Sequence, residues 1–420
     1  MARYKTVHIA APYGEATLTF SGYGPVGSSN AFWSGGAYHT ENWERIRFPT
    51  AGTITSLWVK RQSSPSGTHT LYLRQNYADS GLQVTTTAAS QAAEDAATSV
   101  AVAAGDYLAF RSSGGSAYEV VRFLFEPTAD ATQLCIYTAN GVTSSVGIAS
   151  TSATNFLPFC GRLSGTTLTE SQAQMRMKLA GTVSNARIAV LNNDGLIYTN
   201  HSPAVTIRSR KNGAYGNITF TYPPSGDGAQ VDDSNTDTLA IDDLYCWEVS
   251  QITSGGTRAT NISFQYAHSV VNGEHEVFGH PNALALTVTA SGSTRYWPIA
   301  GELQTPGTTE STVSATLGMT CGIKKFRARI TTNNCSGDVT FAIYKNGIAS
   351  AVTFVVGAGL TGDFIDDVNE VALASTDTAS VAISGGTSGS FSLSYIAMVI
   401  PGAEVGAVAS VSRSYNRVWG

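Results

Sequence analysis

Charged residues are scarce in this sequence. Asp, Glu, Lys and Arg together make up 13% of the 420 residues, against about 25% in an average globular protein. The formal net charge is -5, and the 25 basic residues are scattered singly. Because no basic stripe is available to hold a phosphate backbone, we expect no nucleic-acid partner.

Long apolar runs are also missing. The N-terminal stretch MARYKTVHIAAPYGEATLTFSGYG lacks the continuous apolar segment of a secretion signal, and no segment is long enough to span a bilayer. We therefore expect neither a secretion signal nor membrane insertion.

Cysteine is sparse as well. The five cysteines lie far apart, share no Cys-x-x-Cys spacing and are odd in number, which favours buried free thiols over disulfides or metal ligands. A cytoplasmic pattern of cysteines is thus combined with the low charge typical of an extracellular protein. Virion proteins that assemble inside a host cell show this combination.

The composition instead favours glycine and small or β-branched residues. There are 42 glycines, with a visible excess of Ser, Thr, Ala and Val, and such residues suit strands and turns better than exposed helices. The length suggests about two to four domains.

One pattern occurs three times along the chain. Residues 155–190 align without a gap with residues 295–330, at an offset of 140, and a more divergent copy lies at 30–61. The matched positions include Thr40-Glu41, Thr169-Glu170 and Thr309-Glu310, as well as Pro158 with Pro298 and Arg187 with Arg327. This repeat predicts three related modules.

The second half of the pattern is centred on Lys-Asn-Gly. Residues 205–233 match residues 339–367 at an offset of 134, which aligns Lys211-Asn212-Gly213 with Lys345-Asn346-Gly347. A later aspartate follows at matched positions, Asp243 and Asp377, and Asp106 takes this place in the first copy, where Arg74-Gln75-Asn76 stands for Lys-Asn-Gly. Asn-Gly before an alternating apolar run predicts a type I′ hairpin turn, formed by Asn212 and Gly213 and again by Asn346 and Gly347.

The repeat boundaries divide the chain into modules, arms and linkers. The predicted division is an N-terminal arm at 1–29, module 1 at 30–127, a linker at 128–154, module 2 at 155–268, a linker at 269–293, module 3 at 294–401 and a C-terminal tail at 402–420.

The local pattern within a module is that of β-strands. In KKFRARI, Phe326, Ala328 and Ile330 alternate with Lys325, Arg327 and Arg329, which is the two-residue period of a half-buried strand. Many short strands between Gly-, Asn- and Asp-rich turns are typical of a sandwich or jelly roll. The predicted fold is all-β, with three tandem β-sandwich, jelly-roll-like modules and extended N- and C-terminal arms, arranged as a rod or a stack.

This order of signals resembles the tandem jelly-roll-like repeats of phage virion proteins. The signals are an aromatic-Pro-x-x-Gly start, Thr-Glu, Ala-Gly-Thr before a strand, Lys-Asn-Gly in a hairpin and Gly-Asp before a late strand, and they cover about 300 residues. The first copy departs from the pattern, since it has Trp33-Ser34 in place of the aromatic-Pro start. The resemblance implies a tail, fibre, surface or capsid-decoration component.

The string GEHEVFGHP is the strongest candidate for a catalytic metal site. A zinc-protease helix needs two histidines four residues apart with a glutamate between them. Here His275 and His280 are five apart, and Gly279 and Pro281 oppose a helix. We therefore interpret this string, which includes Glu276, as a solvated loop.

Acidic pairs recur at Asp232-Asp233 and at Asp366-Asp367, with Glu94-Asp95 in the first copy. Their oxygens could hold calcium, but aspartate at a turn more often binds nearby backbone amides. We favour the turn interpretation and expect no cofactor. The recurrence of Thr-Glu in every copy likewise favours a hydrogen-bonding role at the start of a strand over catalysis.

Two further groups of residues are candidates for contacts with partners. Trp58 is out of phase with Leu57 and Val59 on its strand, so it is a candidate platform for a glycan or a protein partner. The apolar C-terminal tail is a candidate for assembly between subunits, through Arg413, Tyr415, Arg417 and Trp419.

Together these features favour a non-enzymatic virion protein that is made in the host cytoplasm. Its expected partners are further copies of itself and other virion proteins, contacted through arms and strand edges. The alternatives are an adhesin or tail fibre that binds a host-surface glycan or receptor, and an extracellular filament subunit. A polysaccharide depolymerase ranks last, because no acid and base constellation is visible in the sequence.

Overall fold

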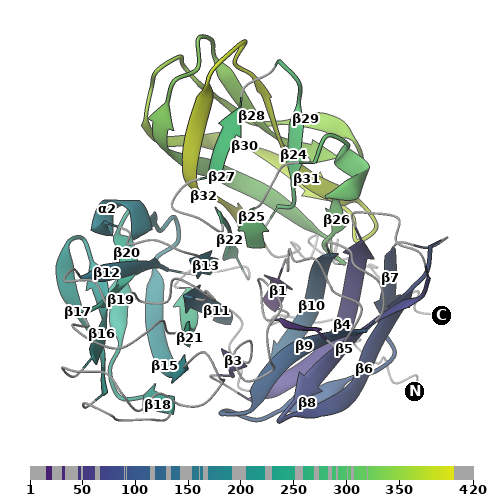
Figure 1. Cartoon of the computed structure of the whole chain (residues 1–420), viewed down its shortest axis with the longest axis vertical. Coiled ribbons are helices and arrows are strands. Elements are labelled where there is room, and N and C mark those ends of the chain that lie inside the picture. The colour runs from purple at the N-terminus through teal and green to yellow at the C-terminus, as the bar shows by residue number, and fades with distance from the viewer. Residues whose placement is uncertain are drawn as a thin grey trace, which may run out of the picture.

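The computed structural model describes residues 16–20, 31–33, 46–48, 51–61, 67–88, 90, 92–113, 119–128, 134–141, 154–159, 161–163, 169–191, 205–222, 229–250, 259–268, 274–281, 286–289, 292–299, 301–303, 307–318 and 320–401. These residues form three β-sandwiches that follow one another along the chain (Figure 1). The predicted all-β fold is confirmed. The tail residues Arg413, Tyr415, Arg417 and Trp419 lie outside the described residues.

Each module packs two sheets face to face. One sheet contains the Lys-Asn-Gly hairpin or its equivalent, and we call it the hairpin sheet. The other sheet contains a long strand that contacts a neighbouring module, and we call it the docking sheet.

In module 1, the docking sheet has the order β1 (Ala16–Phe20), β10 (Glu119–Pro127), β4 (Gly52–Arg61) and β7 (Ala92–Asp95), with β8 (Val100–Val102) also pairing β4. Its hairpin sheet has the order β2 (Ala31–Trp33), β9 (Tyr107–Ser113), β5 (His69–Gln75) and β6 (Ala78–Thr86), with β3 (Ile46–Arg47) pairing β9.

In module 2, the docking sheet has the order β13 (Gly161–Leu163), β11 (Leu134–Gly141), β21 (Ala259–His268), β15 (Gly181–Leu191) and β18 (Ala229–Asp232), with β19 (Asp237–Leu239) also pairing β15. Its hairpin sheet has the order β12 (Asn155–Pro158), β20 (Leu244–Val249), β16 (Val205–Lys211) and β17 (Ala214–Tyr222), with β14 (Met175–Arg176) pairing β20. The short helix α2 (Glu170–Ala173) precedes β14.

In module 3, the docking sheet has the order β25 (Gly301–Leu303), β22 (His275–Pro281), β32 (Ser390–Ile400), β27 (Cys321–Asn333) and β30 (Gly362–Leu373), with β23 (Leu286–Thr289) also pairing β32. Its hairpin sheet has the order β24 (Arg295–Trp297), β31 (Thr378–Gly385), β28 (Val339–Lys345) and β29 (Ile348–Val356), with β26 (Ala315–Thr316) pairing β31. A 3-10 turn, η1 (Glu310–Thr312), stands where module 2 has α2.

The predicted alternation of β27 is present in the sandwich of module 3. Phe326, Ala328 and Ile330 are buried in its core together with Phe341 of β28. Burial of such apolar side chains between two sheets is the main stabilising term in each module.

The segments predicted as an N-terminal arm and as linkers contain strands that belong to the sandwiches, so this part of the prediction is wrong. β1 pairs β10, β11 pairs β21, and β22 pairs β32. In each module a strand from the preceding segment therefore completes the docking sheet. The string GEHEVFGHP was expected to be a loop, but it contains the strand β22. Gly279 lies within this strand and pairs with Gly301 of β25.

The expected rod or stack is also wrong. The three sandwiches lie around a common centre, with β1, β11, β13, β22 and β25 near the middle (Figure 1). β1 contacts both β11 and β25, and β13 contacts β22, so each module touches the other two. None of the helices among the described residues is long and apolar enough to cross a membrane.

Candidate functional site

The Lys-Asn-Gly hairpin of module 3 is held by a fixed set of hydrogen bonds. Asn346 and Gly347 have φ values of 50° and 80°, as the two central residues of a type I′ turn require. The Asn346 amide donates to Asp377 Oδ1 at 2.7 Å and accepts from the Thr378 N–H at 2.8 Å. Lys345 Nζ lies 2.9 Å from Asp377 Oδ2. The two hydrogen bonds of Asn346 and this ion pair together hold the turn against the start of β31.

The same arrangement recurs in module 2. Asn212 and Gly213 have φ values of 51° and 82°. The Asn212 amide donates to Asp243 at 2.6 Å, and Lys211 lies 3.0 Å from the same carboxylate. The lysines of both turns are thus paired with an aspartate of their own module.

Module 1 has the same arrangement, but the residues equivalent to Lys-Asn-Gly lie one position later than expected from the sequence. Asn76 has a φ of 50° and donates to Asp106 at 2.8 Å, so Gln75-Asn76-Tyr77 is equivalent to Lys-Asn-Gly. Gln75 replaces lysine and donates to Asp106 at 2.7 Å. Tyr77 has a φ of 71° where the other modules have glycine.

The acidic pairs stabilise turns. Asp366 accepts the backbone N–H groups of Thr353, Val368 and Asn369 at 2.9 to 3.1 Å. Its equivalent Asp232 accepts the N–H groups of Thr219 and Asn235. The second members of the pairs, Asp233 and Asp367, are exposed. Among the described residues no cluster of three or more metal-binding side chains occurs.

The Thr-Glu motif begins a short helical turn in modules 2 and 3, and not a strand as expected. In module 2, Thr169 is the N-cap of α2, and Glu170 binds Arg210 of β16 at 2.7 Å. In module 3, Glu310 accepts a hydrogen bond from Ser380 of β31 at 2.9 Å. Glutamate therefore joins this turn to the hairpin sheet.

Glu276, from the candidate zinc string, is buried where module 2 meets module 3. Its carboxylate accepts the backbone N–H groups of Lys178 and Leu179 and lies 2.6 Å from Arg327 Nη2. Arg327 also donates to the backbone oxygen of Arg176 at 2.9 Å. The Glu276 carboxylate is therefore engaged by an arginine and two N–H donors. These contacts place Arg327 and Arg329, on one face of β27, against module 2.

A second set of contacts surrounds this pair. Arg329 donates to the backbone oxygens of Ser171 and Gln174 at 3.1 and 3.2 Å. Asp363 bridges Arg329 and Arg176, at 2.8 and 3.0 Å. Burial opposes the effect, but these two arginines hold the pKa of Asp363 below its ordinary value.

Module 1 docks on module 3 in the equivalent way. Lys60 corresponds to Arg329, and Ser314 corresponds to Gln174; Lys60 Nζ donates to the Ser314 backbone oxygen at 2.7 Å. Trp58, at the position of Arg327, is 7% exposed and packs on Ala315. Trp58 therefore faces a partner within its own chain, and its proposed use as a glycan platform is wrong because its ring is covered.

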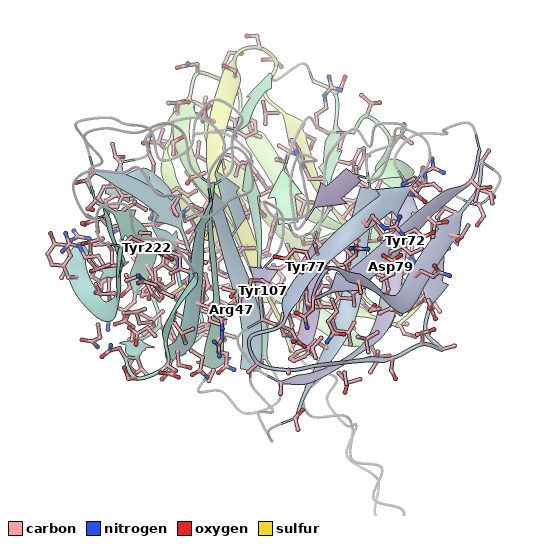
Figure 2. The ribbon with its side chains drawn as sticks, turned by 60° about the horizontal axis from the view of Figure 1, so that its bottom comes forward. Arg47, Tyr72, Tyr77, Asp79, Tyr107 and Tyr222 are labelled. Atoms are coloured by element: carbon pink, nitrogen blue, oxygen red, sulfur yellow. The ribbon has the colours of Figure 1, made fainter. Side chains whose placement is uncertain are left out.

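Module 2 docks on module 1 to complete the ring. Its strands β15 and β21 contact β3, and Ser263 Oγ donates to the backbone oxygen of Arg47. Figure 2 shows Arg47 where modules 1 and 2 meet, close to Tyr107. Every module thus offers its docking sheet to the hairpin sheet of another, which closes a head-to-tail ring.

Exposed apolar side chains remain at the hairpin tips. Tyr77 is 47% exposed, Tyr215 is 60% exposed and Ile348 is 73% exposed. All three lie within three residues of the asparagine of a turn, one in each module. Tyr215 stacks with Arg208, whose guanidinium carbon lies 3.4 Å from the ring centroid.

Three of the cysteines are buried free thiols. These are Cys246, Cys321 and Cys335. Burial raises the pKa of Cys321 to about 12 and also raises the pKa of Cys246 and of Cys335. These thiols are therefore protonated near neutral pH and poorly suited to act as nucleophiles.

The repeat matches Arg187 with Arg327, but it indicates no role for either residue. The docking function of this position, and that of Glu276, was missed. The available signal was that an arginine recurs at the matched positions 187 and 327 of two copies of the repeat.

Comparison with known proteins gives little further information. No known protein family and no curated protein matches the chain. Matched solved structures include the mosquito-larvicidal Cry4Aa toxin and the insecticidal delta-endotoxin Cry8Ea1, both from Bacillus thuringiensis, at 10% and 11% identity. The matches cover 85% and 86% of this chain but 53% and 54% of the toxins, so the chain spans about half of their length. The TM-scores of 0.20 and 0.16 are too low to support an inference.

Proposed function

We propose that this chain is a non-enzymatic structural component of a virus particle. The observation that supports this most directly is how the recurring polar residues are used. The aspartates of the turns bind backbone and asparagine amides, and the glutamates bind arginine, serine or backbone donors. Side chains repeated in this way serve the fold of each module and the closure of the ring.

The ring also supports a mode of assembly. Three equivalent modules related by head-to-tail contacts place equivalent residues on the same side of the ring. The hairpin tips that carry Tyr77, Tyr215 and Ile348 would thus form a three-point surface for a neighbouring virion protein or for a second copy of the chain. Several weak contacts of this kind act together if one partner engages them at once.

Mass spectrometry of purified particles tests the virion assignment. The protein should be recovered in a fixed ratio to the capsid or tail proteins after density-gradient purification. Its absence from particles produced by cells that express it would contradict the proposal.

Light scattering of the purified protein measures its assembly, and removal of residues 402–420 should reduce the assembled state if the tail joins subunits.

A glycan-binding function is the second candidate, and the exposed tyrosines favour it. Tyr77 and Tyr215 offer aromatic surfaces beside the ion pairs Arg74–Asp79 and Arg208–Glu248, which are suited to sugar rings and their hydroxyls. Binding on a glycan array that is lost in Tyr77→Ala or Tyr215→Ala would support it. The buried Trp58 is not expected to affect such binding directly.

A further inference from the structure

The junction of modules 2 and 3 shows how arginines are neutralised in this ring. Arg327 is paired with Glu276 at 2.6 Å, and Arg176 lies 3.0 Å from Asp363 and 3.8 Å from Asp242. Each of these two arginines thus has at least one carboxylate partner, although Asp363 is shared with Arg329. The carboxylates offset the cost of removing the guanidinium groups from water.

The junction of modules 1 and 2 keeps the arginines and lacks these carboxylates. Arg47 occupies the position of Arg176, and Arg187 that of Arg327. The positions of Asp242, Glu276 and Asp363 are taken by Gly105, Ile136 and Ala229.

The strand register establishes these equivalences. Ile136 pairs Gln265 as Glu276 pairs Val399. In the same way, Ala229 pairs with the docking strand of module 2 where Asp363 pairs with that of module 3.

The hydrogen bonds at the two junctions differ accordingly. At the junction of modules 2 and 3, Arg327 donates to the Arg176 backbone oxygen. At the junction of modules 1 and 2, Ser263 donates to the Arg47 backbone oxygen. Ser263 is the residue that Arg187 faces in the strand register, so the serine takes over the contact and leaves the guanidinium of Arg187 for another acceptor.

At the junction of modules 1 and 2, both arginines have a buried nitrogen atom with no hydrogen-bond acceptor among the described residues. The Nε atoms of Arg47 and Arg187 are buried and have no hydrogen-bond partner in the part of the chain that the structure describes. The Nε atom of Arg327 also lacks one, but Arg327 Nη2 is paired with Glu276. Burial and the nearby charge of Arg47 lower the pKa of Arg187, and only Asp233 acts against them. Both side chains remain partly accessible, so a small solute can reach them.

We propose that the junction of modules 1 and 2 binds a small tetrahedral oxyanion, phosphate or sulfate, between Arg47 and Arg187. The anion takes the place that the carboxylates of Glu276 and Asp363 occupy at the next junction. Guanidinium groups are well suited to this ligand, because they donate two parallel N–H groups to a pair of oxygens. The site is independent of the proposed role in a virion.

The proposal predicts that oxyanions stabilise the full-length protein. Thermal unfolding is followed while inorganic phosphate is titrated at constant ionic strength against chloride, with sulfate and acetate as parallel series. A ligand that binds only the folded chain raises Tm with saturation, so we expect a saturable rise of a few degrees with phosphate and sulfate at millimolar concentration. Acetate reports whether a carboxylate serves equally well. A rise with acetate alone, or no saturable rise with any oxyanion, would overturn the proposal.

Arg187→Gln is the variant that removes the site. It should lose at least most of the phosphate-dependent rise, and in chloride its Tm should equal or exceed that of the wild type, because an unneutralised charge has been removed. Arg295→Gln removes an arginine elsewhere on module 3 and should keep the full response. An unchanged phosphate response in Arg187→Gln would show that the effect is general salting-out and would reject the site.

Gly105→Asp provides a second variant that does not depend on loss of an arginine. A Cβ at Gly105 would lie 3.6 Å from Arg47 Nη2, and the equivalent Asp242 has a similar backbone, with φ of 71° against 96°. The new carboxylate should compete with the anion and weaken phosphate binding at least tenfold. Equal phosphate affinity in this variant would contradict the placement of the ligand beside Arg47.

Discussion

The pair formed by Arg327 and Glu276 is a buried charge pair that joins two modules. The Arg327 side chain is 2% exposed and the Glu276 side chain is 0% exposed. Burial of both charges is tolerated because Glu276 also accepts two backbone N–H groups and Arg327 donates to a backbone oxygen. Such a pair adds little net stability over apolar residues, but it strongly disfavours the loss of one partner.

Removal of one partner should therefore be much worse than removal of both. We expect Glu276→Ala or Arg327→Met to lower the free energy of unfolding by about 3–5 kcal/mol, because each leaves a buried charge unpaired. The double variant should cost clearly less than the sum of the two. Urea denaturation followed by tryptophan fluorescence measures the differences, with the exposed Glu370→Gln as control. Additive effects would show that the two groups do not act as a pair.

Asp366 gives a prediction for acid stability. Burial opposes the effect, but hydrogen bonds from Asn369, Thr353 and Val368 hold the pKa of Asp366 below its ordinary value. A carboxyl whose pKa is lower in the folded state stabilises the protein above the unfolded pKa of about 3.9, and this stabilisation is lost as the pH falls through the folded pKa.

We expect Asp366→Asn to lower the free energy of unfolding by about 1–2 kcal/mol at pH 7 and by less at about pH 3. Asp367→Asn, which changes the exposed neighbour, should stay within about 0.5 kcal/mol of the wild type. Urea denaturation at a series of pH values measures both. Equal effects of the two variants would favour a shared role, as in a calcium site.

At the scale of the element, the hairpin turn has the same geometry in all three modules. Two successive residues have positive φ in each turn, and the asparagine side chain binds the aspartate just before the neighbouring strand of the hairpin sheet, β9, β20 or β31. The Lys-Asn-Gly motif identified two of these turns from the sequence, because Asn-Gly is the pair that best tolerates this conformation. The turn with Tyr77 was assigned to the wrong register, since tyrosine carries no such signal.

Gly347→Ala should destabilise the chain by about 1 kcal/mol. The nearest atom to a Cβ at this position is Glu310 Oε2 at 3.9 Å, so the cost comes from the backbone conformation alone and not from a clash. Gly337→Ala, at a glycine without positive φ, should be neutral or slightly stabilising. Thermal unfolding of both variants gives the comparison, and equal Tm values would argue against the turn assignment.

Other elements could not be predicted from the local pattern. The strands β11 and β22 lie in segments that read as linkers, because their pairing partners β21 and β32 are more than 100 residues away in the sequence. Local patterns report which face of a strand is apolar, but they do not report which distant strand it pairs.

At the scale of the whole molecule, the ring makes each module depend on its neighbours. The three junctions use the same positions with different chemistry: an ion pair between modules 2 and 3, a tryptophan between modules 3 and 1, and, between modules 1 and 2, two arginines whose buried Nε atoms have no hydrogen-bond partner among the described residues. The repeats have thus diverged at their contacts while they kept their turns.

Trp58→Ala should weaken the junction of modules 3 and 1. Truncation of a buried aromatic residue costs about 3–5 kcal/mol, and here the contact that is lost joins the first module to the last. We expect a larger radius of gyration by small-angle X-ray scattering, with near-unchanged far-UV circular dichroism. Tyr77→Ala removes an exposed aromatic and should leave the radius unchanged. An unchanged radius in Trp58→Ala would mean that the remaining contacts close the ring.

The sequence by itself determined the all-β class, the three repeats, the hairpin turns at Asn212 and Asn346 and the faces of β27. These are local properties, because backbone conformation at Asn-Gly and alternation along a strand depend on nearby residues. Only the tertiary structure decided that the modules close into a ring, that Trp58 and Arg327 face neighbouring modules, and that Glu276 is buried. Those outcomes depend on which surfaces meet, since a polar or aromatic face has the same sequence pattern whether water or another module covers it.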